Sequence, residues 1–73
     1  MFEGNMHEGI KCGFGRLYWD NGKVVYSGYW KKNIPVGNEI IIHNKAGEII
    51  YKGKSLGIYF CLFIFSNKFR YSN

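Results

Sequence analysis

The sequence predicts an all-β protein built from successive antiparallel β-hairpins in one elongated, single-layer sheet. Three observations support this prediction. Short runs of β-branched and aromatic residues alternate with turn-forming residues, as in strands joined by tight turns. Similar segments recur at spacings of 24 and 25 residues, which indicates an internal repeat. The chain has 73 residues, of which 19% are aromatic, so it is long enough for one domain with a small core.

The first repeat is expected over residues 2–25, and its clearest turn signal is Asp20-Asn21-Gly22. Asn and Gly adopt positive φ angles at low cost, which a tight hairpin turn requires. Apolar residues suited to strands lie on both sides, at Leu17–Trp19 and Val24–Tyr26. This segment is therefore predicted to be a β-hairpin.

The second repeat is expected over residues 26–50. Strands are predicted at Ile40–His43 and from Glu48 to Tyr51, with a turn between them at Asn44–Gly47. Residues 31–37 are expected to end one strand and turn the chain into the next unit. Residues 51–55 begin a third unit. A single hairpin is marginal in water, so the units are expected to stack on one another.

Aromatic and glycine residues keep the same phase in each unit. Phe2-Glu3-Gly4 recurs as Tyr26-Ser27-Gly28 and again as Tyr51-Lys52-Gly53. A glycine in a strand lets a neighbouring ring lie directly against the backbone. The expected motif residues are Phe2, Gly4, Gly13, Gly15, Gly22, Tyr26, Gly28, Trp30, Gly37, Gly47, Tyr51 and Gly53.

Residues 56–73 depart from the repeat pattern. Residues 56–65 are almost wholly apolar, but a membrane-spanning helix needs about 20 such residues. We expect an apolar strand or cap that closes the last hairpin, followed by a basic tail. Two alternatives are an interfacial membrane anchor backed by Lys68 and Arg70, and a segment unrelated to the fold.

Residue types capable of catalysis or metal binding are isolated in the sequence. Cys12 and Cys61 do not make a disulfide framework, and the N-terminus lacks a signal-peptide pattern, which favours an intracellular location. His7 and His43 have no second metal ligand in register. Gly53-Lys54-Ser55 lacks the earlier glycine that a phosphate-binding loop requires. We therefore expect no enzyme activity, no metal and no cofactor.

The charge distribution indicates a candidate lipid-binding set. The net charge is +5, and residues 54–73 contain three basic and no acidic side chains. Such a balance favours anionic surfaces. Nucleic acid is the disfavoured partner, because acidic residues are interspersed through residues 1–53. The candidate lipid-binding residues are Lys31, Lys32, Lys52, Lys54, Lys68 and Arg70.

Four aromatic residues are candidates for partner binding: Tyr18, Trp19, Tyr26 and Trp30. Successive side chains of a strand point to opposite faces, so two roles remain open for them. They either stack in the core between hairpins or form an outward groove for a helix or peptide. A partner strand added at an open sheet edge is a further binding mode.

The pattern resembles the MORN repeat over residues 2–53. Tyr26-Ser27-Gly28-Tyr29-Trp30 and Gly13-Phe14-Gly15 match its motif, whereas Met6 replaces an aromatic residue and Glu39 replaces the second glycine of Gly-x-Gly. The resemblance implies a non-catalytic structural or adaptor protein. Its expected partners are proteins, in a homo-oligomer or a larger assembly.

The resemblance also implies a location and two alternative functions. The expected location is the cytoplasm, a cytoskeletal or ciliary structure, or the cytosolic face of a membrane junction. One alternative is a module that binds phosphoinositides or an anionic membrane surface. The other is a bacterial antitoxin-like immunity protein, because a related bacterial repeat is similar.

Overall fold

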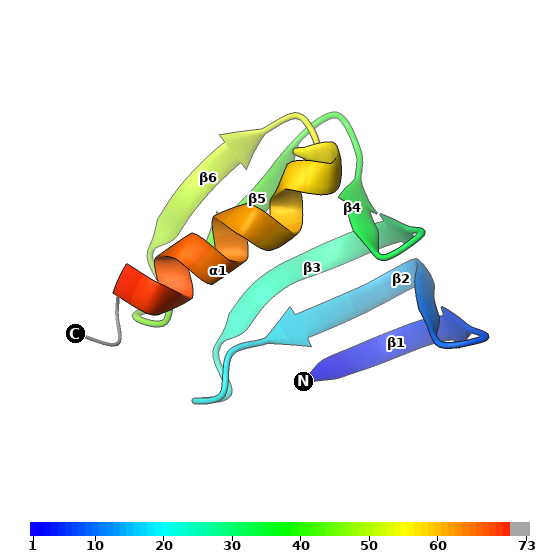
Figure 1. The fold of residues 1–73 in the computed structure, drawn as a ribbon, viewed down its shortest axis with the longest axis horizontal. Helices are drawn as coiled ribbons and strands as arrows, with labels where there is room; N and C mark the ends of the chain where they lie inside the picture. The colour runs from blue at the N-terminus through cyan, green and yellow to red at the C-terminus, as the bar shows by residue number, and fades with distance from the viewer. Residues whose placement is uncertain (71–73) are drawn as a thin grey trace.

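The computed structural model describes the backbone of residues 1–70 and the side chains of residues 1–65 (Figure 1). Six strands are followed by a 3-10 turn and a helix. The strands are β1 (Phe2–His7), β2 (Ile10–Tyr18), β3 (Val24–Lys31), β4 (Ile34–Val36), β5 (Ile40–His43) and β6 (Ile49–Gly53). The helical elements are η1 (Gly57–Tyr59) and α1 (Phe60–Arg70).

All strand pairs are antiparallel and join neighbours along the chain. Strands β1 to β4 form a four-stranded sheet in sequence order, and β5 and β6 form a separate two-stranded sheet. The expected all-β fold of successive hairpins is thus confirmed. The strands are divided between two sheets, however, where the sequence predicted one continuous sheet.

Two further hairpin turns lie 24 residues apart; the sequence analysis did not locate the first and placed the second only within residues 31–37. Glu8 and Gly9 have φ angles of 52° and 79°, and they join the end of β1 to the start of β2. Lys32 and Asn33 have φ angles of 51° and 69°, and they join β3 to β4. Positive φ at both central residues is the signature of a type I′ hairpin turn.

The division into two sheets follows from a break in the second repeat. Gly15 pairs with Gly28, and one repeat later Ile40 pairs with Gly53. Ile40 therefore occupies in the second repeat the position that Gly15, the second Gly-x-Gly glycine, has in the first. The sequence analysis had assigned this position to Glu39, one residue earlier. The strand that is continuous in the first repeat as β2 is therefore split into β4 and β5, with a bend at residues 37–39.

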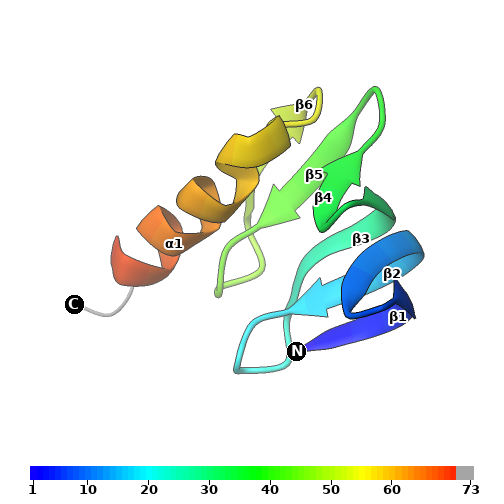
Figure 2. The ribbon, with the colours of Figure 1, turned by 45° about the vertical axis from the view of Figure 1, so that its right-hand side comes forward.

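The core lies between the sheets and α1 (Figure 2). An edge-on aromatic contact joins Phe60 of α1 to Trp30 of β3, with ring centroids 5.7 Å apart. A second joins Phe63 to Tyr51 of β6, also at 5.7 Å. The buried apolar side chains are Trp19, Val25, Tyr26, Trp30, Ile40, Ile42 and Phe60. The helix therefore connects the two sheets by packing against both.

The expectation of a closing strand in residues 56–65 is wrong, because this segment is helical. Gly57 has a φ of 62°, which turns the chain away from the direction of β6. Phe60, Phe63 and Ile64 then share one helix face and pack on the core. A helix satisfies its own backbone hydrogen bonds, so it can cover a sheet face without pairing to a strand edge. Within the described residues, no helix has the length and apolar character needed to cross a membrane.

Candidate functional site

The Tyr-x-Gly motif is a packing device that occurs twice in full. The Tyr26 hydroxyl donates a hydrogen bond to the Tyr29 carbonyl at 3.0 Å, and the Tyr51 hydroxyl donates to the Lys54 carbonyl at 2.6 Å. Each ring folds back over the glycine two residues later. A Cβ at Gly28 would lie 2.5 Å from the Tyr26 Oη, so a side chain there would displace the ring. Burial raises the pKa of the Tyr26 phenol.

Trp30 is the centre of the aromatic stack. Its ring contacts those of Phe2 and Tyr26 edge-on, with both centroid distances at 5.3 Å. The indole N–H donates to the Gly15 carbonyl at 3.0 Å. A Cβ at Gly15 would lie 2.3 Å from Cζ of Phe2, so this glycine provides the surface on which the Phe2 ring lies.

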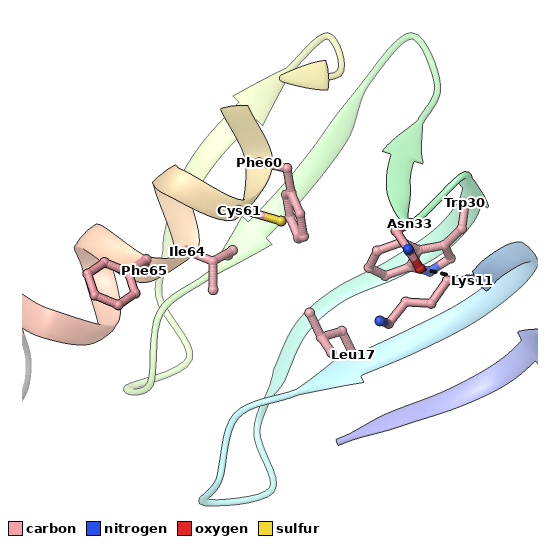
Figure 3. Close-up of a pocket in the computed structure, with 8 residues that line it drawn as sticks. All are labelled: Lys11, Leu17, Trp30, Asn33, Phe60, Cys61, Ile64 and Phe65. Carbon is pink, nitrogen blue, oxygen red and sulfur yellow. Dashed lines mark hydrogen bonds between the residues drawn. The ribbon is translucent and has the colours of Figure 1, made fainter. Parts of the chain in front are cut away.

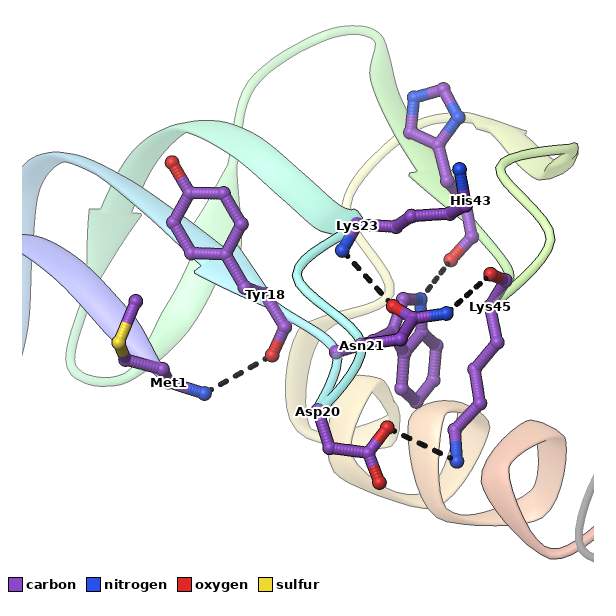
Figure 4. Close-up of polar contacts among 8 residues, drawn as sticks. Met1, Tyr18, Asp20, Asn21, Lys23, His43 and Lys45 are labelled. Atoms are coloured by element: carbon purple, nitrogen blue, oxygen red, sulfur yellow. Dashed lines mark hydrogen bonds and ion pairs between the residues drawn. The ribbon is translucent and has the colours of Figure 1, made fainter.

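Turns of successive repeats are tied together at one end of the molecule (Figure 4). The Asn21 side-chain amide donates to the Lys45 carbonyl at 2.8 Å, and the Lys45 ammonium lies 3.4 Å from the Asp20 carboxylate. The Trp19 indole N–H donates to the His43 carbonyl at 2.9 Å. Gly22 and Gly47 have positive φ angles, which shape the two turns. Gly13 in β2 and Gly37 in the bend after β4 also have positive φ angles.

These stacked hairpins agree with the comparison against protein families. The family model for the MORN repeat matches residues 2–24 and 26–38. The chain is a MORN-repeat protein. No curated protein and no solved structure matches the chain. MORN repeats are commonly involved in protein or membrane interactions, and the family is generally non-catalytic.

The aromatic residues of this MORN protein that were considered for partner binding are mostly internal. Trp19 is 6% exposed, and Tyr26 and Trp30 are each 3% exposed. An outward contact role does not fit these three residues, because almost none of their ring surface is available. Tyr18 is half-buried, and its hydroxyl lies 3.4 Å from a Glu3 carboxylate oxygen. Their geometry fits the alternative role of stacking between hairpins.

The candidate lipid-binding lysines are exposed but spread over several elements. Lys31 and Lys32 lie at the end of β3 and in the following turn. Lys52 lies on β6, 4.0 Å from Glu39, and Lys54 follows that strand. The side chains of the remaining candidates, Lys68 and Arg70, lie outside the described part of the chain.

An exposed apolar surface lies on the side of η1 and α1 that faces away from the core. We call it the outer helix patch and define it as Ile58, Tyr59 and Leu62, which are 75%, 63% and 66% exposed. The sequence analysis missed it because it treated residues 56–65 as one undivided run. Helical spacing contained the signal, because positions 60, 63 and 64 fall on one side and positions 58 and 62 on another.

A groove separates α1 from the four-stranded sheet (Figure 3). Its volume is about 430 Å³, and its walls are largely aromatic and aliphatic. A hollow of about 240 Å³ adjoins it and shares Leu17 and Ile64 as lining residues. The groove is lined by Lys11, Leu17, Trp30, Asn33, Phe60, Cys61, Ile64 and Phe65. We call it the helix–sheet groove.

The residue types that could bind a metal or act as nucleophiles are spread over the described part of the chain. Within this part of the chain, no three His, Cys, Asp or Glu residues are grouped closely enough to hold a metal ion. The His43 imidazole Nδ1 lies 3.3 Å from the Gly47 carbonyl oxygen. Cys12 is half-buried and Cys61 is exposed, and both are free thiols.

Proposed function

We propose that this MORN-repeat protein is a non-catalytic adaptor that binds a protein partner through the outer helix patch. The observation that supports the proposal is the exposure of large apolar side chains on η1 and the first turn of α1, a helix whose opposite face is already packed. Ile58 and Leu62 are four residues apart, so their side chains lie along one side of the helical segment. Association with a partner would remove this apolar area from water, which is favourable.

The partner contact must extend beyond the patch itself. A stable interface buries roughly 800 Å² on each partner, more than three side chains supply. An apolar helix or groove on the partner would cover the patch and also touch the neighbouring sheet surface. Single exposed hydrophobic residues are normal, whereas a cluster of large ones, here two on η1 and one on α1, supports an interaction site.

Site-specific photocrosslinking tests the proposal directly. A benzoylphenylalanine placed at position 62 of the full chain should form discrete protein adducts in the cells that produce it. The same group at the exposed position 23, on the β2–β3 turn, is the matched control. Ile58→Gln in the position-62 variant should remove those adducts. Identical adduct patterns from positions 62 and 23 would contradict the proposal.

A specific observation also favours an anionic membrane surface as a second candidate function. Residues 55–67 contain no charged side chain, and this run includes the outer helix patch. The exposed Lys54 precedes it directly. An apolar helix face bordered by lysine is suited to the interface of an anionic bilayer.

Vesicle co-sedimentation separates the two candidates. Membrane binding predicts pelleting with phosphatidylserine vesicles but not with phosphatidylcholine vesicles, weakening steeply as salt rises. Leu62→Gln should reduce it, whereas Ser27→Gln on the exposed sheet surface should not. Absence of pelleting with either vesicle would leave the protein partner as the working function.

The proposed adaptor would act inside the cell, within a cytoskeletal or ciliary assembly or at the cytosolic face of a membrane. A second copy of the chain is one partner of the required kind, and sedimentation velocity tests it. The antitoxin-like alternative predicts a toxin gene beside the gene for this chain. Finding a toxin that this chain neutralises would replace the adaptor proposal.

A further inference from the structure

We propose that the helix–sheet groove binds a free medium-chain carboxylate, an acyl chain with one anionic end. This site is separate from the proposed partner surface, because Ile58 and Leu62 do not line the groove. The inference depends on three features: the shape of the groove, its apolar walls and the position of one lysine (Figure 3).

The walls of the groove are suited to an alkyl chain. The sheet contributes Trp30 and Leu17, and the helix contributes Phe60 and Ile64, so both walls are apolar. The Trp30 and Phe60 rings touch edge-on and form one continuous apolar surface. The adjoining hollow continues past Leu17 and Ile64 toward Val25 and Trp19. Small-molecule sites are typically concave, predominantly apolar and at least about 300 Å³ in volume.

Lys11 supplies the charge that selects an anion. Its Nζ lies 5.3 Å from the centre of the Phe2 ring and 6.0 Å from that of Trp30, which holds the ammonium at the groove. The ion pairs among the described residues use other cations, so no carboxylate in this part of the chain lies within ion-pair distance of Lys11. An ammonium beside apolar walls favours a ligand with one anionic end and an apolar body.

Titration of the full chain with decanoate tests the inference, with decanol as the uncharged comparison. Isothermal calorimetry measures both affinities. Tryptophan fluorescence, from Trp30 in the groove and Trp19 in the adjoining hollow, reports occupation of the site. Decanoate should bind about five- to tenfold more tightly than decanol, as expected for one partly exposed charge contact. Lys11→Gln should abolish that preference, while Lys11→Arg and the distant control Lys23→Gln should retain it. Circular dichroism confirms that each variant is folded.

Several results would overturn the inference. Equal affinity for decanoate and decanol would remove the role of Lys11, as would an unchanged preference in Lys11→Gln. Binding only at decanoate concentrations that form micelles would show that no groove for a single chain exists. Tighter binding of an acidic amphipathic peptide than of decanoate would assign the groove to a protein.

Discussion

At the scale of single residues, the repeat glycines act mainly by leaving room for aromatic rings. Gly4, Gly15 and Gly28 are register partners across β1, β2 and β3. The Phe2 ring lies on Gly15, and the Tyr26 ring lies over Gly28. The motif therefore encodes flat contacts between rings and backbone, which larger residues would prevent.

Gly15→Ala is predicted to destabilise the protein by about 1–3 kcal/mol, the usual effect of overpacking a core. The new Cβ would lie 2.3 Å from Cζ of Phe2. Urea unfolding followed by circular dichroism measures the loss. In a Phe2→Leu background, the same change should have less than half the effect. An equal loss in both backgrounds would exclude the ring contact as the cause.

Tyr26→Phe is predicted to alter the dependence of stability on pH. Burial raises the pKa of Tyr26 in the folded protein, so the folded state holds this proton more tightly than the unfolded state. The resulting stabilisation is fully present below about pH 10, the unperturbed tyrosine value, and is lost as pH rises through the folded pKa.

Tyr26→Phe removes the hydroxyl hydrogen bond, so the variant should be less stable than the wild type by about 1 kcal/mol at pH 7. That gap should narrow above pH 10. Unfolding in urea at pH 7 to 11 measures it, with Tyr59→Phe at an exposed position as control. A gap that stays constant across this range would contradict the prediction.

At the scale of elements, the hairpins of the two complete repeats pair their strands with the same irregularity, although the second repeat is broken by a bend. A register shift separates Leu17 from Tyr18, and an equivalent shift separates Ile42 from His43. The two turns that follow differ in how they are stabilised. The first is fixed by Asn21, which accepts a hydrogen bond from the Lys23 N–H, and the second by the buried Asn44.

Asn44→Ala is predicted to cost about 2–3 kcal/mol of stability. The Asn44 side-chain oxygen accepts hydrogen bonds from the N–H groups of Ala46 and Glu48, both at 2.9 Å. Alanine would leave both donors without this acceptor in a buried turn. Thermal unfolding measures the effect, with the exposed Asn38→Ala as the control. Similar losses in the two variants would show that the turn does not depend on this side chain.

At the scale of the whole molecule, α1 completes a core that the two sheets leave open. Phe60 is 4% exposed and contacts the Trp30 ring of the larger sheet, while Phe63 contacts Tyr51 of the smaller one. An 11-residue helix is marginal in isolation, so this packing provides most of its stability. The same helix presents the outer helix patch and forms one wall of the groove.

Phe60→Ala is predicted to destabilise the fold by about 3–5 kcal/mol, as expected for removal of a buried phenylalanine. Leu62→Ala, on the same helix but 66% exposed, should change stability by less than about 0.5 kcal/mol. Urea unfolding compares them, and tryptophan fluorescence reports exposure of the buried Trp19 and Trp30 in the first variant. Equal effects of the two substitutions would show that α1 does not pack on the core through Phe60.

The sequence by itself determined the repeat, its family and the hairpin fold. The regular spacing of aromatic and glycine residues determines which strands pair. Each motif ring needs a glycine beside it, so the strands pair in the register that places rings over glycines. Asp20-Asn21-Gly22 and Asn44–Gly47 encode their turns locally. These features depend on contacts within a repeat or between adjacent repeats, which is why the residue pattern was sufficient to predict them.

Only the tertiary structure decided the split into two sheets, the helix and the candidate sites. Strand pairing shows that Ile40, and not Glu39, occupies the position of the second motif glycine. The second repeat is one residue longer than the first, so the sequence spacing alone did not reveal this. The apolar run of residues 56–65 is compatible with either a strand or a helix in isolation, and packing of Phe60 against Trp30 favours the helix. Burial of Trp19, Tyr26 and Trp30 and exposure of Ile58 and Leu62 follow from that packing. Alternation along a strand places residues on opposite faces, but tertiary packing decides which face is covered.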